Sequence, residues 1–217
     1  MNGLYNGVFV MRDRQTGSLW THFDGSVLQG PLAGTGVALD LQPLVHTTWA
    51  EWLAIHPDTL VPEWETPYTN RYRDVTPGGG NLGRAFQESL LNDDDRLERG
   101  QLVLGAGVGA DFRAYVLDDF SGQLSVLADE LGGFPIVVFL NPDDSFGLAY
   151  SAEIDGTVLE FRVEGEMIID DEGTTWDIAG NAIAGPRAGT SLQFVTSFVT
   201  EWYGWAAYYP DTSIYGR

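Results

Sequence analysis

Histidines and aspartates near the start of the chain are its best candidates for catalysis or metal binding. His22, His46 and His56 are the only histidines of the 217 residues, and Asp13 and Asp58 lie near them in sequence. Neutral imidazole ligates metal ions and titrates near neutral pH, so these side chains suit a metal site or general acid–base catalysis. We therefore take all five as catalytic candidates, and His46, His56 and Asp58 as candidate metal ligands. A structural interpretation competes, in which His56 ends a helix and the aspartates cap turns.

Tryptophans offer a second kind of candidate site, because aromatic side chains can line a pocket for a sugar or a flat ligand. Trp49 and Trp52 stand three residues apart, as do Trp202 and Trp205, so each pair occupies one face of a predicted helix. The same spacing is typical of helices packed on a core, and this is the interpretation that we favour over a pocket. The candidate pocket residues are Trp20, Trp49, Trp52, Trp176 and Trp202.

Three other motifs indicate turns more than chemistry. The sequence Gly-Pro-x-Ala-Gly-Thr at 30–35 and 185–190 has no lysine, so it predicts a turn and not a phosphate-binding loop. The acidic run 92–96 lacks the ligand spacing of an EF-hand, which favours a solvated turn over a cation site. Ser18 and Thr175 lack the Gly-x-Ser-x-Gly context of a hydrolase nucleophile.

The elements that must position these candidates occur twice. Gly25–Thr35 resembles Gly180–Thr190, and the Trp49–Thr59 segment resembles Trp202–Thr212. We therefore predict an internally duplicated, strand-rich unit, each copy closed by a short Trp-containing helix. A hairpin at Asn6-Gly7 should open the first copy. Thr48 and Glu51 form a capping box before the first helix, and prolines end both helices.

The predicted fold class is α+β, mainly β. Residues 1–68 form a first repeat whose front half is absent, residues 69–100 connect, and residues 101–217 form a second, more complete repeat, all in one packed globular unit. Pro77–Gly80 is the loosest part of the connection. Further short strands are expected near Val37–Leu41 and Ser191–Val195. Hydrophobic, β-branched runs predict strands over Gln101–Val108, Phe112–Leu117, Leu124–Ala128, Pro135–Leu140 and Val158–Val163.

Composition restricts the partners. Asp and Glu total 31 against 11 basic residues, all arginine, which gives a formal net charge of −20. Such a surface repels nucleic acid and anionic membranes, and the apolar runs are too short for membrane insertion. Cysteine is absent, which excludes disulfides and thiol chemistry. The acidity favours a salt-adapted (haloarchaeal-like) protein, since salt screens self-repulsion; we expect a monomer or small homo-oligomer.

Several of these motifs resemble a known family. Asp13–Trp20, Gly30–Gly34, His56–Thr59 and Arg113–Tyr115 are similar to the pattern of the domain of unknown function family 3179. The resemblance implies an extracytoplasmic location, although these residues contain no export signal and a cytoplasmic location stays open. It implies no activity. Members commonly carry a Cys-Pro-Leu-Cys-type segment upstream of the first hairpin, so we expect a shortened member or a fragment of a longer gene.

Two functions follow from these observations. The first is a non-catalytic domain that binds a small ligand or a protein partner in a salt-adapted organism. The alternative is a metal-assisted hydrolase or another enzyme that uses the histidines and carboxylates of the first repeat. The sequence indicates no particular cofactor. Convergence of two histidines and a carboxylate would favour the enzyme, whereas an aromatic cleft without them would favour binding.

Overall fold

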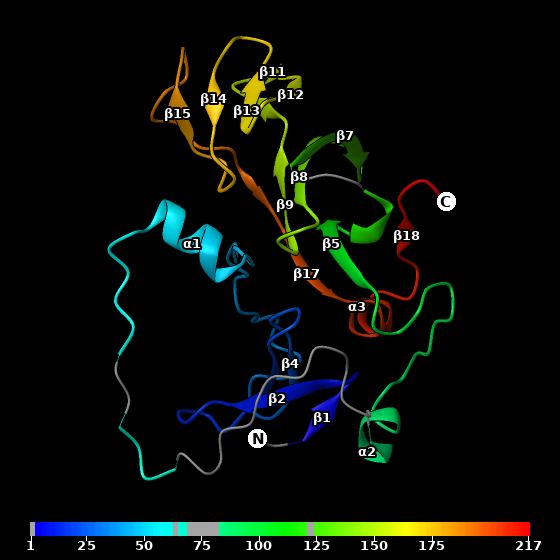
Figure 1. Ribbon diagram of the computed structural model, residues 1–217. Coiled ribbons are helices and arrows are strands. Elements are labelled where there is room, and N and C mark those ends of the chain that lie inside the picture. The colour runs from blue at the N-terminus through cyan, green and yellow to red at the C-terminus, as the bar shows by residue number, and fades with distance from the viewer. Residues whose placement is uncertain (1–2, 63–64, 69–82, 121–123) are drawn as a thin grey trace.

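The computed structural model describes residues 3–62, 65–68, 83–120 and 124–217 and is mainly β (Figure 1). The described strands form four four-stranded sheets and one two-stranded hairpin. The described residues form the α-helices α1 (Trp49–Ile55), α2 (Arg84–Gln87) and α3 (Trp202–Tyr208) and a 3-10 helix at Leu117–Asp119. This confirms a mainly β, α+β fold class. The predicted loose point at 77–80 lies outside the described residues.

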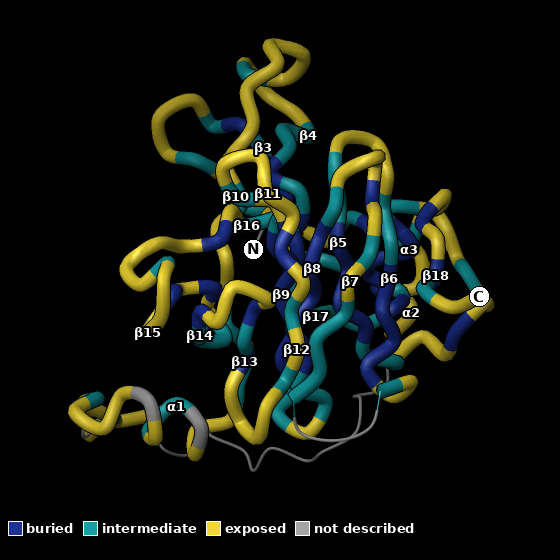
Figure 2. The backbone as a smooth tube through the Cα atoms, turned by 90° about the horizontal axis from the view of Figure 1, so that it is seen from above, coloured by how far each residue is buried: buried dark blue, intermediate teal, exposed yellow. Residues whose placement is uncertain are grey.

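Two central sheets carry most of the core. One has the order β17-β5-β6-β18 and the other β16-β9-β8-β7. Strands β5, β8 and β9 are largely dark blue in Figure 2. Leu104 and Tyr115 of one sheet and Val138 and Ala149 of the other are fully buried in one cluster. The strands are β5 (Leu102–Val108), β6 (Asp111–Val116), β7 (Ser125–Leu131), β8 (Phe134–Asn141), β9 (Phe146–Ser151), β16 (Phe194–Val195), β17 (Ser197–Glu201) and β18 (Ser213–Ile214).

Two smaller sheets flank this centre and share one strand order. The first small sheet has the order β1-β2-β3-β4 and the second the order β12-β13-β14-β15. Asn6 and Gly7 both have positive φ in the turn between β1 and β2, as the Asn-Gly hairpin signal predicts. The strands are β1 (Leu4–Tyr5), β2 (Val8–Arg12), β3 (Leu19–Thr21), β4 (Val27–Gln29), β12 (Phe161–Glu164), β13 (Met167–Asp170), β14 (Thr175–Trp176) and β15 (Ala182–Ala184).

Each small sheet contains the same carboxylate–indole contact. Asp13 Oδ2 accepts a hydrogen bond from Trp20 Nε1 at 2.9 Å in the first small sheet. Asp170 Oδ2 accepts one from Trp176 Nε1 at 3.0 Å in the second. Both aspartates also accept backbone N–H groups of their own turn, so each carboxylate fixes a hairpin turn and a tryptophan together.

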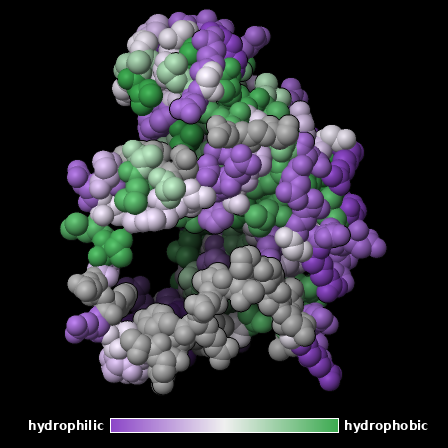
Figure 3. Space-filling model, viewed as in Figure 1, coloured by the Kyte–Doolittle hydropathy of each residue, from purple (hydrophilic) through white to green (hydrophobic). Residues whose placement is uncertain are grey.

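Helices α1 and α3 also share their local contacts but differ in burial. Trp52 Nε1 donates to Thr59 Oγ1 and Trp205 Nε1 donates to Thr212 Oγ1, both at 2.9 Å. Trp205 is nevertheless fully buried, whereas Trp49 of α1 is 53% exposed. Hydrophobic residues are also exposed beside α1 in the space-filling view (Figure 3). The core interpretation of the paired tryptophans therefore holds for α3 and is wrong for Trp49.

The first small sheet packs on α3. The ring of Phe23 stacks on Tyr208 with centroids 4.4 Å apart, and Thr21 Oγ1 lies 2.7 Å from the Tyr208 hydroxyl. Asn6 Nδ2 donates to the carbonyl of Ala207 at 3.1 Å. Phe23 thereby joins the buried cluster that contains Trp205, so residues from the start and the end of the chain share one core.

Several local predictions differ from the structure, and strands β17 and β18 and helix α2 were not predicted. No strand forms over 37–41, where the Leu39 N–H instead donates to the Gly25 carbonyl. The predicted strand 158–163 is split into β12 and β11 (Thr157–Val158), which pairs with β10 (Glu153–Ile154), because Leu159 turns into the core. Strand β9 was not predicted, since its small residues Gly147 and Ala149 weaken the pattern, yet Gly147 permits close approach to Leu104.

Candidate ligand-binding groove

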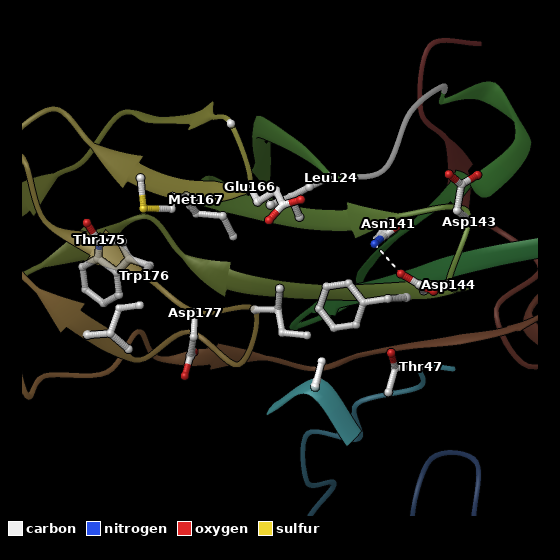
Figure 4. Close-up of a pocket in the computed structure, with 16 residues that line it drawn as sticks. Thr47, Leu124, Asn141, Asp143, Asp144, Glu166, Met167, Thr175, Trp176 and Asp177 are labelled. Atoms are coloured by element: carbon white, nitrogen blue, oxygen red, sulfur yellow. Dashed lines mark hydrogen bonds between the residues drawn. The ribbon is translucent and has the colours of Figure 1, made fainter. Parts of the chain in front are cut away.

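A groove of about 600 Å³ lies between α1 and the second small sheet (Figure 4). Its walls come from the connection before α1 and α1 itself, from the turn between β8 and β9, and from strands β13 to β15 with their connections. The groove thus brings together residues that are far apart in sequence, from Thr47 to Ile183. This size falls within the range of small-molecule sites.

One part of the groove is apolar. Phe146, Ile168 and Trp176 are buried side chains of the core that line its floor. Met167 and Ile183 also line it, and these two are 51% and 61% exposed. Figure 4 shows Met167, Thr175 and Trp176 together at one end. Exposed apolar side chains beside a buried aromatic floor can be covered by an apolar ligand.

The backbone that carries this wall is held by Tyr150 of β9. The Tyr150 hydroxyl donates to the carbonyl of Ile178 at 3.0 Å, and burial raises the pKa of this phenol well above its ordinary value. Gly180 lies directly over the Tyr150 ring, where an added Cβ would come within 2.7 Å of it. Only glycine fits this position, which also has a φ of +78°. The β14–β15 connection is therefore fixed against the central sheet.

Polar side chains occupy the opposite end of the groove. Asn141 Nδ2 donates to Asp144 Oδ2 at 2.6 Å, as Figure 4 shows, and Thr48 Oγ1 donates to Asp144 Oδ1 at 3.2 Å. His46 Nδ1 lies 2.9 Å from the carbonyl oxygen of Ser145. These contacts tie the connection before α1 to the β8–β9 turn. Asn141 Oδ1 is buried and accepts no hydrogen bond from the described part of the chain.

The charged side chains that line the groove are all acidic. Asp143, Asp144, Glu166 and Asp177 line it, and none of the lining residues is arginine, lysine or histidine. Asp177 accepts the backbone and side-chain N–H groups of Asn181 at 2.8 and 3.0 Å, so its charge is used within the fold. Asp143 and Glu166 are exposed and make no such contact among the described residues.

The predicted catalytic and metal residues have separate local surroundings in the structure. His22 stacks on Phe9 with centroids 4.0 Å apart, and His56 packs on Trp52 at 4.2 Å. Asp13 belongs to its hairpin turn, and Asp58 is exposed after α1. Within the ranges that the structure describes, no three His, Asp or Glu side chains are placed to hold one metal ion, and that includes His46, His56 and Asp58.

The Asp13 carboxylate has a structural environment. It accepts hydrogen bonds from the Trp20 indole, from the backbone and hydroxyl of Thr16, and from the N–H of Gly17. These donors, led by the indole, hold the pKa of Asp13 far below its ordinary value. A carboxylate with this many donors is a hydrogen-bond acceptor for the fold and a poor general base.

Of the predicted pocket tryptophans, Trp176 lines the groove. Trp20 and Trp202 are buried in the core, Trp52 is half-buried and Trp49 is exposed on α1. Sequence reasoning did not select the polar residues of the groove. The pair Asp143-Asp144 was visible only as part of the general acidity, because nothing in sequence indicates that α1 lies beside it. The residues missed are Asn141, Asp143, Asp144, Glu166 and Asp177.

In two other polar clusters, aspartates form hydrogen bonds or ion pairs with neighbouring side chains. Asp129 accepts hydrogen bonds from Arg113 Nη1 at 2.6 Å and from the Tyr115 hydroxyl at 2.7 Å, and burial raises the pKa of Tyr115 well above its ordinary value. In the acidic run 92–96, Asp93 pairs with Arg99 and Asp94 with Arg96. These contacts stabilise the central strands and an irregular surface segment at 92–96, in which Asp93 and Asp94 are paired with arginines.

The fold and the groove define a mainly β protein with two similar small sheets, two similar helices and an acidic, partly apolar groove. The family described as "Protein of unknown function (DUF3179)" matches residues 1–212 of the 217, and the chain belongs to this family. Searches of curated proteins and of solved structures found no significant match. Among the described residues, every helix is too short or too polar to cross a membrane.

Proposed function

We propose that this protein is a binding module and that its ligand occupies the groove between α1 and the second small sheet. The observation that carries the proposal is the groove itself, with a volume of about 600 Å³, a buried aromatic floor and a few polar groups at one end. This combination of apolar walls and convergent polar groups is typical of ligand sites.

We further propose that the chain contains one structural unit twice. Three correspondences support this: the common strand order of the two small sheets, the aspartate–tryptophan contact in each, and the tryptophan–threonine contact after each helix. In this arrangement the small sheet of each copy faces the helix of the other. The two copies and the segment 83–100 would then form one packed unit.

The proposed duplication explains why only one of these sheet–helix interfaces is open. Phe23 stands two residues before Gly25 and fills the interface with α3, where it stacks on Tyr208. The residue two before Gly180 is Ile178, which lines the groove. A smaller side chain thus stands where the first small sheet has Phe23. This difference supports the view that the groove is a packing site left unfilled.

Adaptation to high salt is part of the proposal. The net charge of −20 on 217 residues produces self-repulsion that salt screens. The alternative of an enzyme that uses the first-repeat histidines receives no support from the groove, since His22, His46 and His56 do not line it. We therefore retain the non-catalytic ligand-binding function.

The proposal can be tested by nuclear magnetic resonance with 1-naphthalenemethanol as a neutral aromatic probe. We expect saturable shifts of the backbone amides of Met167, Trp176 and Asp177 in the ¹⁵N-labelled protein. Ile178→Phe should refill the groove as Phe23 fills its counterpart and weaken binding about tenfold or more. Val158→Phe, on an exposed position outside the groove, is the matched control and should leave binding unchanged. Shifts spread over the surface, or equal binding by both variants, would refute the proposal.

A further inference from the structure

We infer that the ligand of this groove is a small organic cation, namely an ammonium or amidinium group on an apolar or aromatic body. The inference rests on the proposed function and specifies the chemical class of the ligand. It follows from three features of the groove: its uncompensated charge, the acceptors at its polar end, and its apolar end.

The charge of the groove is uncompensated within the described structure. Four carboxylates line it and no cationic side chain does. Seven arginines form ion pairs elsewhere, for example Arg113 with Asp129 and Arg187 with Glu172. Glu166 and Asp143, in contrast, lie at the groove without a partner in the described residues. A cation bound between the walls would balance these charges, whereas an anion would be repelled.

Hydrogen-bonding groups at the polar end also favour a donor. One N–H of the Asn141 amide is already used by Asp144, and the buried Asn141 Oδ1 is closed to solvent. The acceptors open to a ligand at this end are the carboxylate oxygens of Asp143 and Asp144. An ammonium group brings donors and no acceptor, so it matches this end better than a hydroxyl or a carboxylate does.

The apolar end indicates that the cation carries an organic body. Trp176 and Ile168 form a buried floor, and the exposed side chains of Met167 and Ile183 lie beside it. A hydrated metal ion would leave this surface uncovered, and no described group of carboxylates is arranged to bind a metal ion. An aromatic or alkyl group would bury it and gain hydrophobic free energy.

The test compares 1-naphthylmethylamine, which is cationic at pH 7, with 1-naphthalenemethanol, which has the same ring and no charge. Dissociation constants are measured by the amide shifts described above at one fixed salt concentration. We expect the amine to bind about tenfold more tightly than the alcohol. Asp143→Asn with Glu166→Gln should remove most of that preference. The ammonium group would form one ion pair with each of these partly exposed carboxylates, and each ion pair contributes modestly, so losing both should remove most of a tenfold difference. These two residues make no described hydrogen bonds, so the double variant should fold.

Glu98→Gln is the matched control, because Glu98 is exposed and outside the groove. It changes the net charge and should leave both constants unchanged. Equal binding of amine and alcohol, or an unchanged preference in the double variant, would overturn the inference while the groove remained a binding site. Failure of both probes to shift the groove amides would instead refute the proposed function.

Discussion

Replacing Asp170 should destabilise the protein strongly, because one buried carboxylate serves three donors. Asp170 is fully buried, and its oxygens accept the N–H groups of Glu172 and Thr174 and the indole N–H of Trp176 at 3.0, 2.8 and 3.0 Å. Glu172 is exposed, so its N–H can turn to water in a variant. Thr174 and Trp176 are buried, so their donors would stay unpaired.

The magnitude follows from the number of unpaired donors. A buried donor left without an acceptor costs about 1–3 kcal/mol, so Asp170→Ala should lose roughly 2–6 kcal/mol of unfolding free energy. Asp170→Asn keeps one side-chain oxygen for the backbone donors but turns an N–H towards the indole N–H. The free energy of unfolding should therefore fall by about 1–3 kcal/mol. For a chain of this size, each kcal/mol lowers Tm by about 2–4 °C.

Urea denaturation at constant molar potassium chloride measures these losses, since guanidinium is itself a salt. Asp118→Asn, on an exposed turn, removes the same charge and should change the free energy of unfolding by less than about 0.5 kcal/mol. In a Trp176→Phe background the indole donor is gone, so Asp170→Asn should cost clearly less there than in the wild type. If Asp170→Asn were as stable as Asp118→Asn, or if its cost did not depend on Trp176, the reasoning would be refuted.

Three further predictions concern the whole fold. Tm should rise steeply from dilute buffer to molar potassium chloride, because salt screens the repulsion of a net charge of −20; a Tm that does not move in thermal melts would contradict salt adaptation. Gly105→Ala should lower the free energy of unfolding by about 1–3 kcal/mol or more, because the added Cβ would lie 2.2 Å from the Trp205 ring. In the control Gly100→Ala the added Cβ meets nothing closer than 4.0 Å, so the free energy of unfolding should be nearly unchanged in the same urea titration. Because the pKa of Asp13 is lowered in the fold, its carboxylate stabilises the protein fully above the ordinary pKa of 3.8, and this stabilisation is lost as the pH falls below that value. Asp13→Asn should therefore reduce the acid dependence of Tm between about pH 4 and pH 2. An unchanged slope of Tm against pH in this range would argue against this role of Asp13.

Elements governed by local chemistry were predictable from the sequence. The Asn6-Gly7 turn, the four strands between 101 and 141 and the two tryptophan helices all depend on residues that are neighbours in the chain. Strand β9 was missed because Gly147 and Ala149 give a weak strand signal, although both are required for packing against the facing sheet. The capping role of Glu51 lies outside the side chains that the structure describes.

The groove could not be predicted, because its residues meet only after the chain has folded. Thr47, Asn141 and Trp176 come from three different parts of the fold, and no local pattern indicates that they meet. The histidines attracted attention because imidazole is chemically versatile. All three are exposed and none lines the groove, so their clustering in the first third of the chain did not locate this site.

The difference in burial between α1 and α3 is what makes the groove accessible. Helix α3 is enclosed by β5, where Gly105 admits the Trp205 ring, and by Phe23 of the first small sheet. Helix α1 has the same tryptophan–threonine contact but Trp49 is exposed, and α1 meets the β8–β9 turn through a few polar contacts beside it, such as that of Thr48 with Asp144. Contacts of this kind stabilise much less than a buried aromatic interface does. Helix α1 is therefore the wall of the groove that can adjust to a ligand at the lowest cost, while Trp176 and the central sheets behind it stay fixed.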